Sequence, residues 1–295
     1  MHDDQIRITI DQAIALVNDQ LPSLRGLDIV AVDGGGTVNA MFRVGDSVGV
    51  RFPLRSADPD EVRSYLEHEA LAIAEFARAS PFPAPQPLFI GDPGHEFPLP
   101  WFAQTWLEGG PATSRCHEES DGLAHDLVQL ISSLRGWGTD SRQFAGSGRG
   151  GELKDHDRWM EECIRASERL LDTSAMRRMW TTFRALPRED PDVMCHTDLT
   201  PSNILVAGGR LVGVLDTGGF QPADPALDLV GAWHLLDHQR RELLRRELEC
   251  SDLQWERGRA WAFEQAAGAY WYYQHTNPEM AEMGKTTLER LMADR

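Results

Sequence analysis

Apolar side chains first recur at helical spacing, between residues 6 and 21. The set consists of Ile10, Ala13, Ile14, Val17 and Leu21. Thr9 stands just before it and is a residue type that caps helix N-termini, so the pattern predicts a first amphipathic helix. Further on, apolar and polar residues alternate in short runs bounded by glycine, and we predict three antiparallel strands over 29–32, 38–44 and 48–52.

A second helix and a further strand follow in this N-terminal part. Residues 60–79 are rich in Ala, Leu and Glu and contain neither Gly nor Pro, which predicts a helix. The proline-rich stretch 81–93 requires an extended path. The apolar run 101–107 predicts a buried strand, and we place a lobe boundary at its end, which gives lobes 1–107 and 108–295.

The second lobe is mainly helical in pattern, with a strand-rich stretch at 193–215. Glycines at 146, 148, 150 and 151 predict a flexible loop over 145–151. The chain therefore belongs to the α+β class, with an antiparallel sheet and helix in the smaller N-terminal lobe and a larger, mainly helical C-terminal lobe.

Composition narrows the range of partners and compartments. With 46 acidic and 29 basic residues, the formal charge of −17 argues against a nucleic-acid-binding surface and favours a cationic small molecule, although solubility alone also explains such a charge. The four cysteines form no C-x-x-C pair, so we expect neither a zinc site nor disulfides. The acidic N-terminus and the lack of a long apolar run predict a cytoplasmic protein without membrane association.

The most informative run of residues surrounds His196, Asp198 and Asn203 in the pattern H-x-D-x-x-x-x-N. A predicted hairpin follows, turning at Gly208-Gly209 and ending at Asp216. Because the second strand returns to the end at which the first begins, Asn203 and Asp216 should converge. An amide oxygen and a carboxylate suit Mg²⁺, which keeps several waters and binds substrate phosphates, so a nucleotide is the expected ligand.

Asp198 lies in a turn beside this pair and is free to face a hydroxyl group. An aspartate has an ordinary pKa of about 3.9, so it is too weak a base to deprotonate an alcohol outright. It can orient the hydroxyl and accept its proton late, as the new bond to phosphorus forms.

These motifs resemble the protein-kinase-like aminoglycoside phosphotransferases. The resemblance rests on His196-Thr197-Asp198, Asn203, Asp216-Thr217-Gly218, and on the segments 41–46, 50–53, 106–109, 272–273 and 276–278. It extends over nearly the whole chain and implies a protein-kinase-like bilobal fold.

The resemblance also implies individual roles. Asp198 would be the catalytic residue, Asn203 and Asp216 the Mg²⁺ ligands, and His196 and Asp228 structural supports of the catalytic loop. On the nucleotide side, a glycine turn would cover the phosphates of ATP or GTP, and a hinge segment would contact the nucleobase. The turn consists of Gly34, Gly35 and Gly36, and the hinge runs from Gln104 through Trp106 to Leu107.

Arg51 departs from the kinase pattern, because the resemblance puts it where kinases carry a phosphate-binding lysine. Alternation on the strand directs it away from the apolar face of its neighbours. An arginine can still neutralise phosphate, and we expect it to pair with Glu69, or alternatively with Glu67.

The expected activity is transfer of the nucleotide γ-phosphate to a hydroxyl of a small molecule, and the leading candidate acceptor is an aminoglycoside or related antibiotic. We expect the protein to be a monomer or a weak dimer. Alternatives are a macrolide or metabolite kinase, a non-catalytic nucleotide-binding pseudokinase, and metal-dependent hydrolysis. The candidate residues for binding the acceptor are Asp155, Asp157, Glu161, Glu162, Trp261, Glu264, Trp271, Tyr272 and Glu279. The alternative interpretation is that the acidic residues lie on a solvated helix face and the aromatic residues pack in the core. Cys195 follows two apolar residues on a strand, and we assign it no chemistry.

Overall fold

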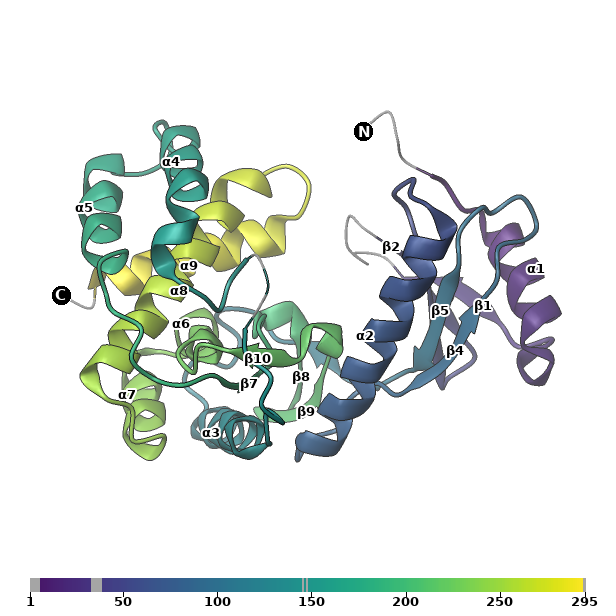
Figure 1. The fold of residues 1–295 in the computed structure, drawn as a ribbon, viewed down its shortest axis with the longest axis horizontal. Coiled ribbons are helices and arrows are strands. Elements are labelled where there is room, and N and C mark those ends of the chain that lie inside the picture. The colour runs from purple at the N-terminus through teal and green to yellow at the C-terminus, as the bar shows by residue number, and fades with distance from the viewer. Residues whose placement is uncertain (1–5, 33–38, 145, 147, 294–295) are drawn as a thin grey trace. The chain divides into compact units, whose positions relative to one another are not determined.

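The computed structural model describes residues 6–32, 39–144, 146 and 148–293, drawn in Figure 1. Its contacts divide the chain into two compact units. Unit 1 contains Met1–Ala77 and Ala84–Glu108, and unit 2 contains Arg78–Pro83 and Gly109–Arg295. The glycine turn at 34–36 lies outside the described residues, so its predicted contact with phosphate remains a prediction.

Unit 1 is built on a five-stranded antiparallel sheet in the order β1-β2-β3-β5-β4. The strands are β1 (Ile29–Ala31), β2 (Asn39–Val44), β3 (Val48–Pro53), β4 (Pro87–Gly91) and β5 (Trp101–Thr105). The three antiparallel strands expected from the first alternating runs are confirmed, and β2 and β3 form a hairpin with Phe42 opposite Val50.

Helix α1 (Ile10–Gln20) begins where the sequence predicts a cap. The Thr9 hydroxyl accepts a hydrogen bond from the Gln12 backbone N–H at 3.2 Å, and Gln12 Oε1 accepts one from the Thr9 N–H at 2.9 Å. This reciprocal capping box satisfies two N–H groups that the helix itself leaves free. The buried face of α1, with Leu16 and Val17, joins the core under the sheet.

Strand β4 was not predicted as a strand, because prolines dominate its neighbourhood. It is an edge strand, and Pro87 is its first residue, a position where the missing N–H costs no ladder hydrogen bond. A Cβ at Gly91 would stand 2.0 Å from the Trp101 ring, so the close packing of β4 on β5 requires glycine. β5 ends at Thr105, two residues before the predicted end.

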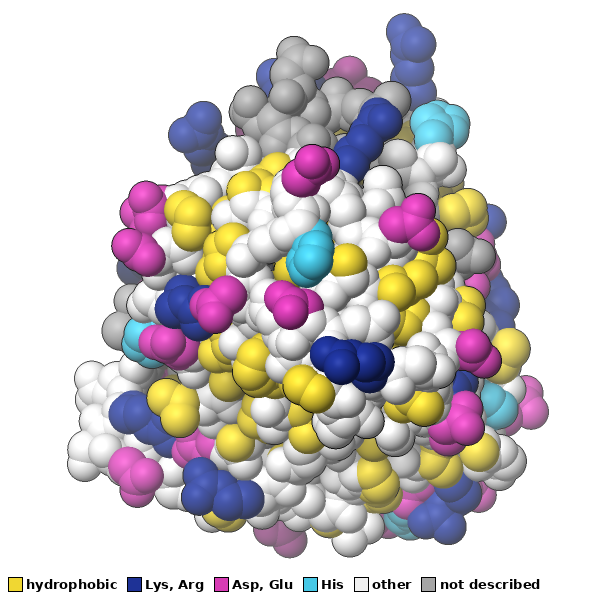
Figure 2. All heavy atoms as spheres, turned by 90° about the vertical axis from the view of Figure 1, so that its right-hand side faces the viewer, with side chains coloured by type: hydrophobic (Ala, Val, Ile, Leu, Met, Phe, Trp, Pro, Cys, Tyr) yellow, Lys and Arg dark blue, Asp and Glu magenta, His cyan; other side chains and the backbone are white. Residues whose placement is uncertain are grey.

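Helix α2 (Pro59–Ala79) spans the predicted helical segment and packs one apolar stripe on the sheet. Leu66 and Ile73 from this helix form a cluster with Phe102 of β5. Acidic, basic and apolar side chains are interspersed on the face of the molecule in Figure 2, as is typical of a surface in contact with water.

Unit 2 is mainly helical. Its helices are α3 (Asp121–Gly136), α4 (Asp157–Ala166), α5 (Thr173–Phe183), α6 (Val230–Leu235), α7 (His238–Glu247), α8 (Asp252–Tyr272) and α9 (Pro278–Ala293). α8 is buried along most of its length and packs closely on α9. A Cβ at Gly284 of α9 would lie 2.7 Å from the Tyr270 backbone nitrogen, so this glycine permits the close approach.

Short strands in unit 2 hold the loops that carry the predicted catalytic and metal-binding residues. β8 (Ile204–Ala207) and β9 (Arg210–Val214) form the predicted hairpin, with Gly208 and Gly209 at positive φ in its turn. β6 (Gly110–Pro111) extends this sheet, while β7 (Val193–Cys195) pairs separately with β10 (Gln221–Ala223). The chain is thus an α+β protein of the predicted class. Within the described part of the chain, no helix has both the length and the apolar character needed to span a membrane.

Candidate active site

His196 begins the predicted catalytic loop, directly after β7, and its imidazole is fully buried. Its Nε2 lies 2.8 Å from the Leu215 carbonyl oxygen, and its Nδ1 lies 3.2 Å from the Asp198 backbone nitrogen. Since the Asp198 N–H can only donate, Nδ1 accepts and Nε2–H donates to Leu215. The imidazole therefore joins the loop that carries Asp198 to the end of β9.

Asp228 supports the same loop from the 3-10 turn η5 (Leu227–Leu229). Its carboxylate accepts hydrogen bonds from the backbone N–H groups of His196, at 2.8 Å, and Thr197, at 2.9 Å. Burial raises the pKa of Asp228, and the two backbone N–H donors oppose that rise. The bonds hold Thr197 at φ +77°, in the left-handed region that β-branched residues rarely adopt.

Asn203, at the end of the 3-10 turn η3 (Pro201–Asn203), fixes the position of Asp198. Its Nδ2 donates to the Asp198 backbone carbonyl at 2.9 Å and to Asp198 Oδ2 at 3.2 Å. Because the amide nitrogen serves these bonds, Oδ1 of Asn203 is left as an oxygen donor for another partner.

Asp216 follows β9 and lies next to this group. The Leu215 N–H donates to the Asn203 carbonyl at 2.8 Å, which joins the two ends of the hairpin immediately before Asp216. Asp216 has φ +54°, is exposed, and forms no ion pair or side-chain hydrogen bond with the other described residues. Asp198, Asn203 and Asp216 therefore meet at one end of the β8–β9 hairpin, as their spacing predicts.

The donor set at this end fits Mg²⁺ better than a metal held by protein alone. Among the described residues, no three His, Cys, Asp or Glu side chains are grouped closely enough to bind a metal ion. Mg²⁺ is commonly held by one or two carboxylates together with substrate phosphates and waters. Oδ1 of Asn203 and the exposed carboxylate of Asp216 fit that pattern.

In unit 1, Arg51 of β3 and Glu69 of α2 form an ion pair. Their side chains are joined by Nη1 and Oε1 at 2.8 Å and by Nη2 and Oε2 at 2.5 Å. The Arg51 guanidinium also lies 4.5 Å from the centre of the Phe102 ring, a cation–π contact. Glu67 is exposed, so Glu69 rather than this alternative is the partner of Arg51.

The predicted hinge continues from β5. Gln104 pairs with Gly49 of β3, and the Trp106 backbone N–H donates to the Ser47 carbonyl at 2.7 Å. The Trp106 ring packs over Gly49, where an added Cβ would lie 3.2 Å from the ring, and the Arg43 guanidinium stands 5.4 Å from the ring centre. Main-chain contacts thus hold the segment that leads to Leu107.

Two of the predicted acceptor residues, Asp157 and Trp261, have polar partners within unit 2. Asp157 is paired with Arg184, at 2.5 Å and 2.7 Å, and accepts a bond from Trp180, and its pKa is lowered chiefly by the Arg184 hydrogen bond. Trp261 is buried and donates to Asp224 at 2.9 Å. These two side chains are therefore engaged in structural contacts.

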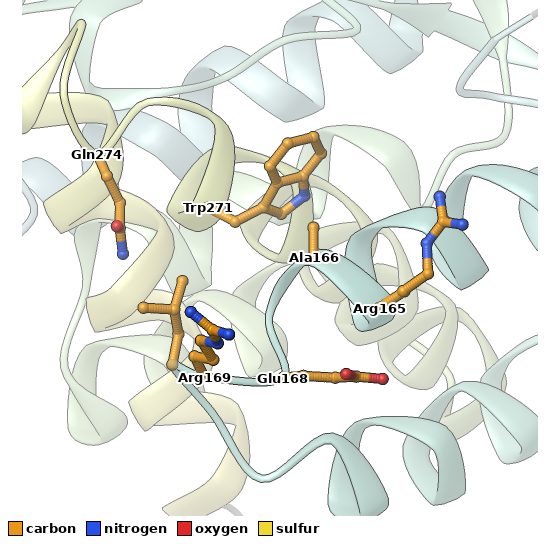
Figure 3. A pocket seen from close by; sticks show the side chains of 7 residues that line it. Arg165, Ala166, Glu168, Arg169, Trp271 and Gln274 are labelled. Carbon is orange, nitrogen blue, oxygen red and sulfur yellow. The ribbon is translucent and has the colours of Figure 1, made fainter.

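Trp271 instead lines a cavity of about 340 Å³ at the ends of α4 and α8, shown in Figure 3. In that view its ring lies beside Ala166, with Gln274 on the left and Arg165 on the right, and Glu168 and Arg169 also line the cavity. None of the predicted catalytic or metal-binding residues lines it. Cys195 is buried, and burial raises the pKa of its thiol, so it is a poor nucleophile.

Arg149 contacts Asp198, although no sequence motif marks this arginine as a site residue. Its Nη1 lies 3.4 Å from Asp198 Oδ1, and its Nε lies 3.7 Å from Oε2 of the buried Glu264. The surrounding glycines predicted only a flexible loop, and no local pattern indicates a partner 49 residues away.

Comparison with known proteins identifies the family. The model of the phosphotransferase enzyme family APH matches residues 29–262, which include Arg51, Asp198, Asn203 and Asp216. The chain belongs to this phosphotransferase family. No curated protein matches the sequence significantly.

Solved structures share the fold of this APH-family chain. A GDP complex of wild-type aminoglycoside 2'-phosphotransferase-IIIa has a TM-score of 0.74 at 15% identity, covering 98% of this chain and 100% of that one. The macrolide 2'-phosphotransferase MphH from Brachybacterium faecium, as apoenzyme, has a TM-score of 0.64 at 18% identity, covering 97% and 99%. The fold is therefore kinase-like, as expected from the resemblance.

Proposed function

We propose that this protein is a cytoplasmic kinase that transfers the γ-phosphate of ATP or GTP to a hydroxyl group of an aminoglycoside or related antibiotic. The observation that carries the proposal is the meeting of Asp198, Asn203 and Asp216 at one end of the β8–β9 hairpin in a phosphotransferase-family chain. Two carboxylates and an amide carried by one end of a hairpin suit the positioning of a hydroxyl and of a metal-bound phosphate.

Asp198 would act on the acceptor. Its carboxylate would accept a hydrogen bond from the acceptor hydroxyl while that oxygen attacks the γ-phosphorus. The bond between the γ-phosphorus and the bridging oxygen of the β-phosphate breaks, the proton passes to Asp198 and then to solvent, and the products are a phosphorylated acceptor and a nucleoside diphosphate. The bond from Asn203 Nδ2 would hold the carboxylate for this task, and the bond that the Asp198 backbone N–H donates to the buried His196 would hold the loop.

Asn203 and Asp216 would hold Mg²⁺. When bound, the ion neutralises charge on the β- and γ-phosphates. Asn203 would use Oδ1, because Nδ2 is directed to Asp198. Asp228 would support the loop through its two backbone bonds without touching the ion.

In unit 1 the nucleotide would meet Arg51 and the hinge. The Arg51 guanidinium, held by Glu69, would neutralise phosphate in place of a lysine. Backbone groups from Gln104 to Leu107 would contact the base, and the turn at 34–36 would cover the phosphates. Structural neighbours include a GDP complex and a ternary complex with streptomycin and ATP, which keeps both nucleotides as candidate donors.

A macrolide is the second candidate acceptor. MphH, a macrolide 2'-phosphotransferase, has the same fold as this chain over nearly its full length. Neighbours that act on aminoglycosides include a GDP and kanamycin complex of an APH(2'') enzyme, at 16% identity and a TM-score of 0.72. The acceptor test must therefore contain both classes.

The test is turnover with an acceptor panel. Wild-type protein is incubated with Mg²⁺, either nucleotide, and aminoglycosides and macrolides in separate reactions, and the products are read by mass spectrometry. We expect one acceptor class to gain a phosphate, and Asp198→Asn to lower kcat by about 10²–10⁴-fold. Asp140→Asn, at an exposed position with φ +51°, is the matched control and should keep wild-type turnover. Product formation that is unaffected in Asp198→Asn would contradict the proposal.

A further inference from the structure

The catalytic loop contains no cation of its own. Residues 196–203 read His-Thr-Asp-Leu-Thr-Pro-Ser-Asn, without Lys or Arg. Arg149, from a loop far away in sequence, brings a guanidinium to this place, with Nη1 at 3.4 Å from Asp198 Oδ1. Asp198 Oδ2 accepts from Asn203 at 3.2 Å. Each oxygen of the carboxylate therefore has one N–H donor, and together the two donors fix the plane of the carboxylate.

The other edge of Arg149 faces a second carboxylate. Its Nε lies 3.7 Å from Oε2 of Glu264, whose side chain is only 5% exposed and whose Oε2 has no hydrogen-bond partner among the described residues. Glu264 Oε1 is 2.9 Å from His156 Nδ1. A buried carboxylate needs compensating charge, and Arg149 and His156 supply it from two sides.

The loop that carries Arg149 is fixed on both sides of this residue. The Gly148 carbonyl lies 3.1 Å from His156 Nε2, and the Gly150 carbonyl accepts a bond from the Asp224 backbone N–H at 3.0 Å. Gly150 has φ +110°, and a Cβ there would stand 2.8 Å from that of Ala223. Glycine is therefore required at this position for the loop to approach β10.

We propose that Arg149 is a positioning residue for phosphoryl transfer, which orients the Asp198 carboxylate toward the acceptor hydroxyl while Glu264 and His156 hold the guanidinium in place. The inference rests on the proposed function, because it concerns the same carboxylate. Both Arg149 and Asp198 are more than one-third exposed, at 37% and 39%, so the contact orients the carboxylate more than it stabilises the fold.

The same geometry has one competing interpretation. A guanidinium between two carboxylates resembles an ammonium group of a basic acceptor, and Arg149 would then occupy the place of that group until the acceptor displaces it. The two interpretations predict opposite kinetics. Loss of a positioning residue lowers kcat, whereas loss of an internal competitor lowers the KM for a cationic acceptor.

The experiment compares wild type, Arg149→Lys, Arg149→Ala and the matched control Arg178→Ala with the acceptor that the panel identifies. Arg178 is an exposed arginine of α5. We expect Arg149→Ala to lower kcat about 100-fold with little change in acceptor KM, since small errors of position at a reacting centre have effects of this size. Arg149→Lys should recover part of the loss, and millimolar guanidinium chloride should raise the rate of Arg149→Ala but not of wild type.

Two further measurements separate a structural defect from a loss of positioning. Arg149→Ala should keep the wild-type nucleotide Kd, because nucleotide binding does not depend on the orientation of Asp198. It should also remain folded at the assay temperature, although the charge lost beside Glu264 lowers its unfolding midpoint. An unchanged kcat, or a lower acceptor KM at unchanged kcat, in Arg149→Ala would overturn the inference and leave the proposed function intact. Absence of turnover by wild type with every acceptor would overturn the proposed function, and this assignment with it.

Discussion

The buried ion pair between Asp224 and Arg257 gives the sharpest stability prediction. Both side chains are 2% exposed, and Asp224 Oδ2 accepts from Arg257 Nε at 2.9 Å and Nη2 at 2.5 Å. Asp224→Asn removes the negative charge and leaves the guanidinium with the neutral carbonyls of residues 186, 187 and 151. Removing one partner of such a pair costs about 3–5 kcal/mol.

For a chain of this size the loss corresponds to a fall in Tm of roughly 6–20 °C, at about 2–4 °C for each kcal/mol. Thermal unfolding followed by circular dichroism measures it. Asp252→Asn is the matched control, since the Asp252 carboxylate pairs with Arg245 at the surface and is 96% exposed. The Tm of this variant should equal that of wild type.

A double-mutant cycle tests the cause. Arg257→Met removes the buried cation, so the variant that combines it with Asp224→Asn should be less destabilised than the sum of the two single changes. Strict additivity, or a fall in Tm of Asp224→Asn no larger than that of Asp252→Asn, would refute the reasoning. Because the Asp224 backbone binds Gly150, we also expect the Asp224→Asn variant to lose part of its kcat through Arg149.

Two other predictions concern single contacts. Glu69→Gln removes the charge that holds Arg51, and nucleotide binding measured by calorimetry should weaken about tenfold, equivalent to about 1.4 kcal/mol; an unchanged Kd would exclude Arg51 from the nucleotide site. Burial lowers the pKa of His156, but the hydrogen bond and charge of Glu264 raise it above its ordinary value overall. A raised pKa stabilises the fold below the unfolded-state pKa of about 6.5, and this contribution disappears as the pH rises through the folded-state pKa. In urea unfolding, His156→Gln should therefore be more destabilising at about pH 5.5 than at about pH 8.5, and equal losses at both would be the contrary result.

The features that could be predicted from sequence are those with a local signal. Thr9 and Gln12 lie within one helical turn, so the cap is visible in a few letters. The β8–β9 hairpin is equally local, because Gly208 and Gly209 between two short apolar runs mark the turn that sets its register. That register is what brings Asn203 and Asp216 together, so the end of the hairpin was predictable too.

The features that could not be predicted depend on partners distant in sequence. β4 is a strand because it pairs with β5, although its prolines argue against a ladder. Arg149 and His156 meet Glu264, which lies 108 residues beyond His156, and neither the charges nor the glycines of that loop indicate this partner. Likewise, Asp157 could be named as an acidic residue on a helix face, but only the fold shows that Arg184 neutralises it.

The left-handed backbone at Thr197 and Asp216 bears on how this enzyme can be made more thermostable. Such a conformation costs an ordinary residue roughly 1–2 kcal/mol, and glycine adopts it without that strain. Random libraries selected for heat resistance should therefore enrich glycine at both positions. At 197 the exchange removes a side chain to which no catalytic role is assigned, together with its 3.4 Å hydrogen bond to the Gly219 carbonyl, whereas at 216 it removes a carboxylate assigned to the metal. Survivors that carry the second exchange should be robust but inactive, and a library screened for turnover after heating would retain the first alone.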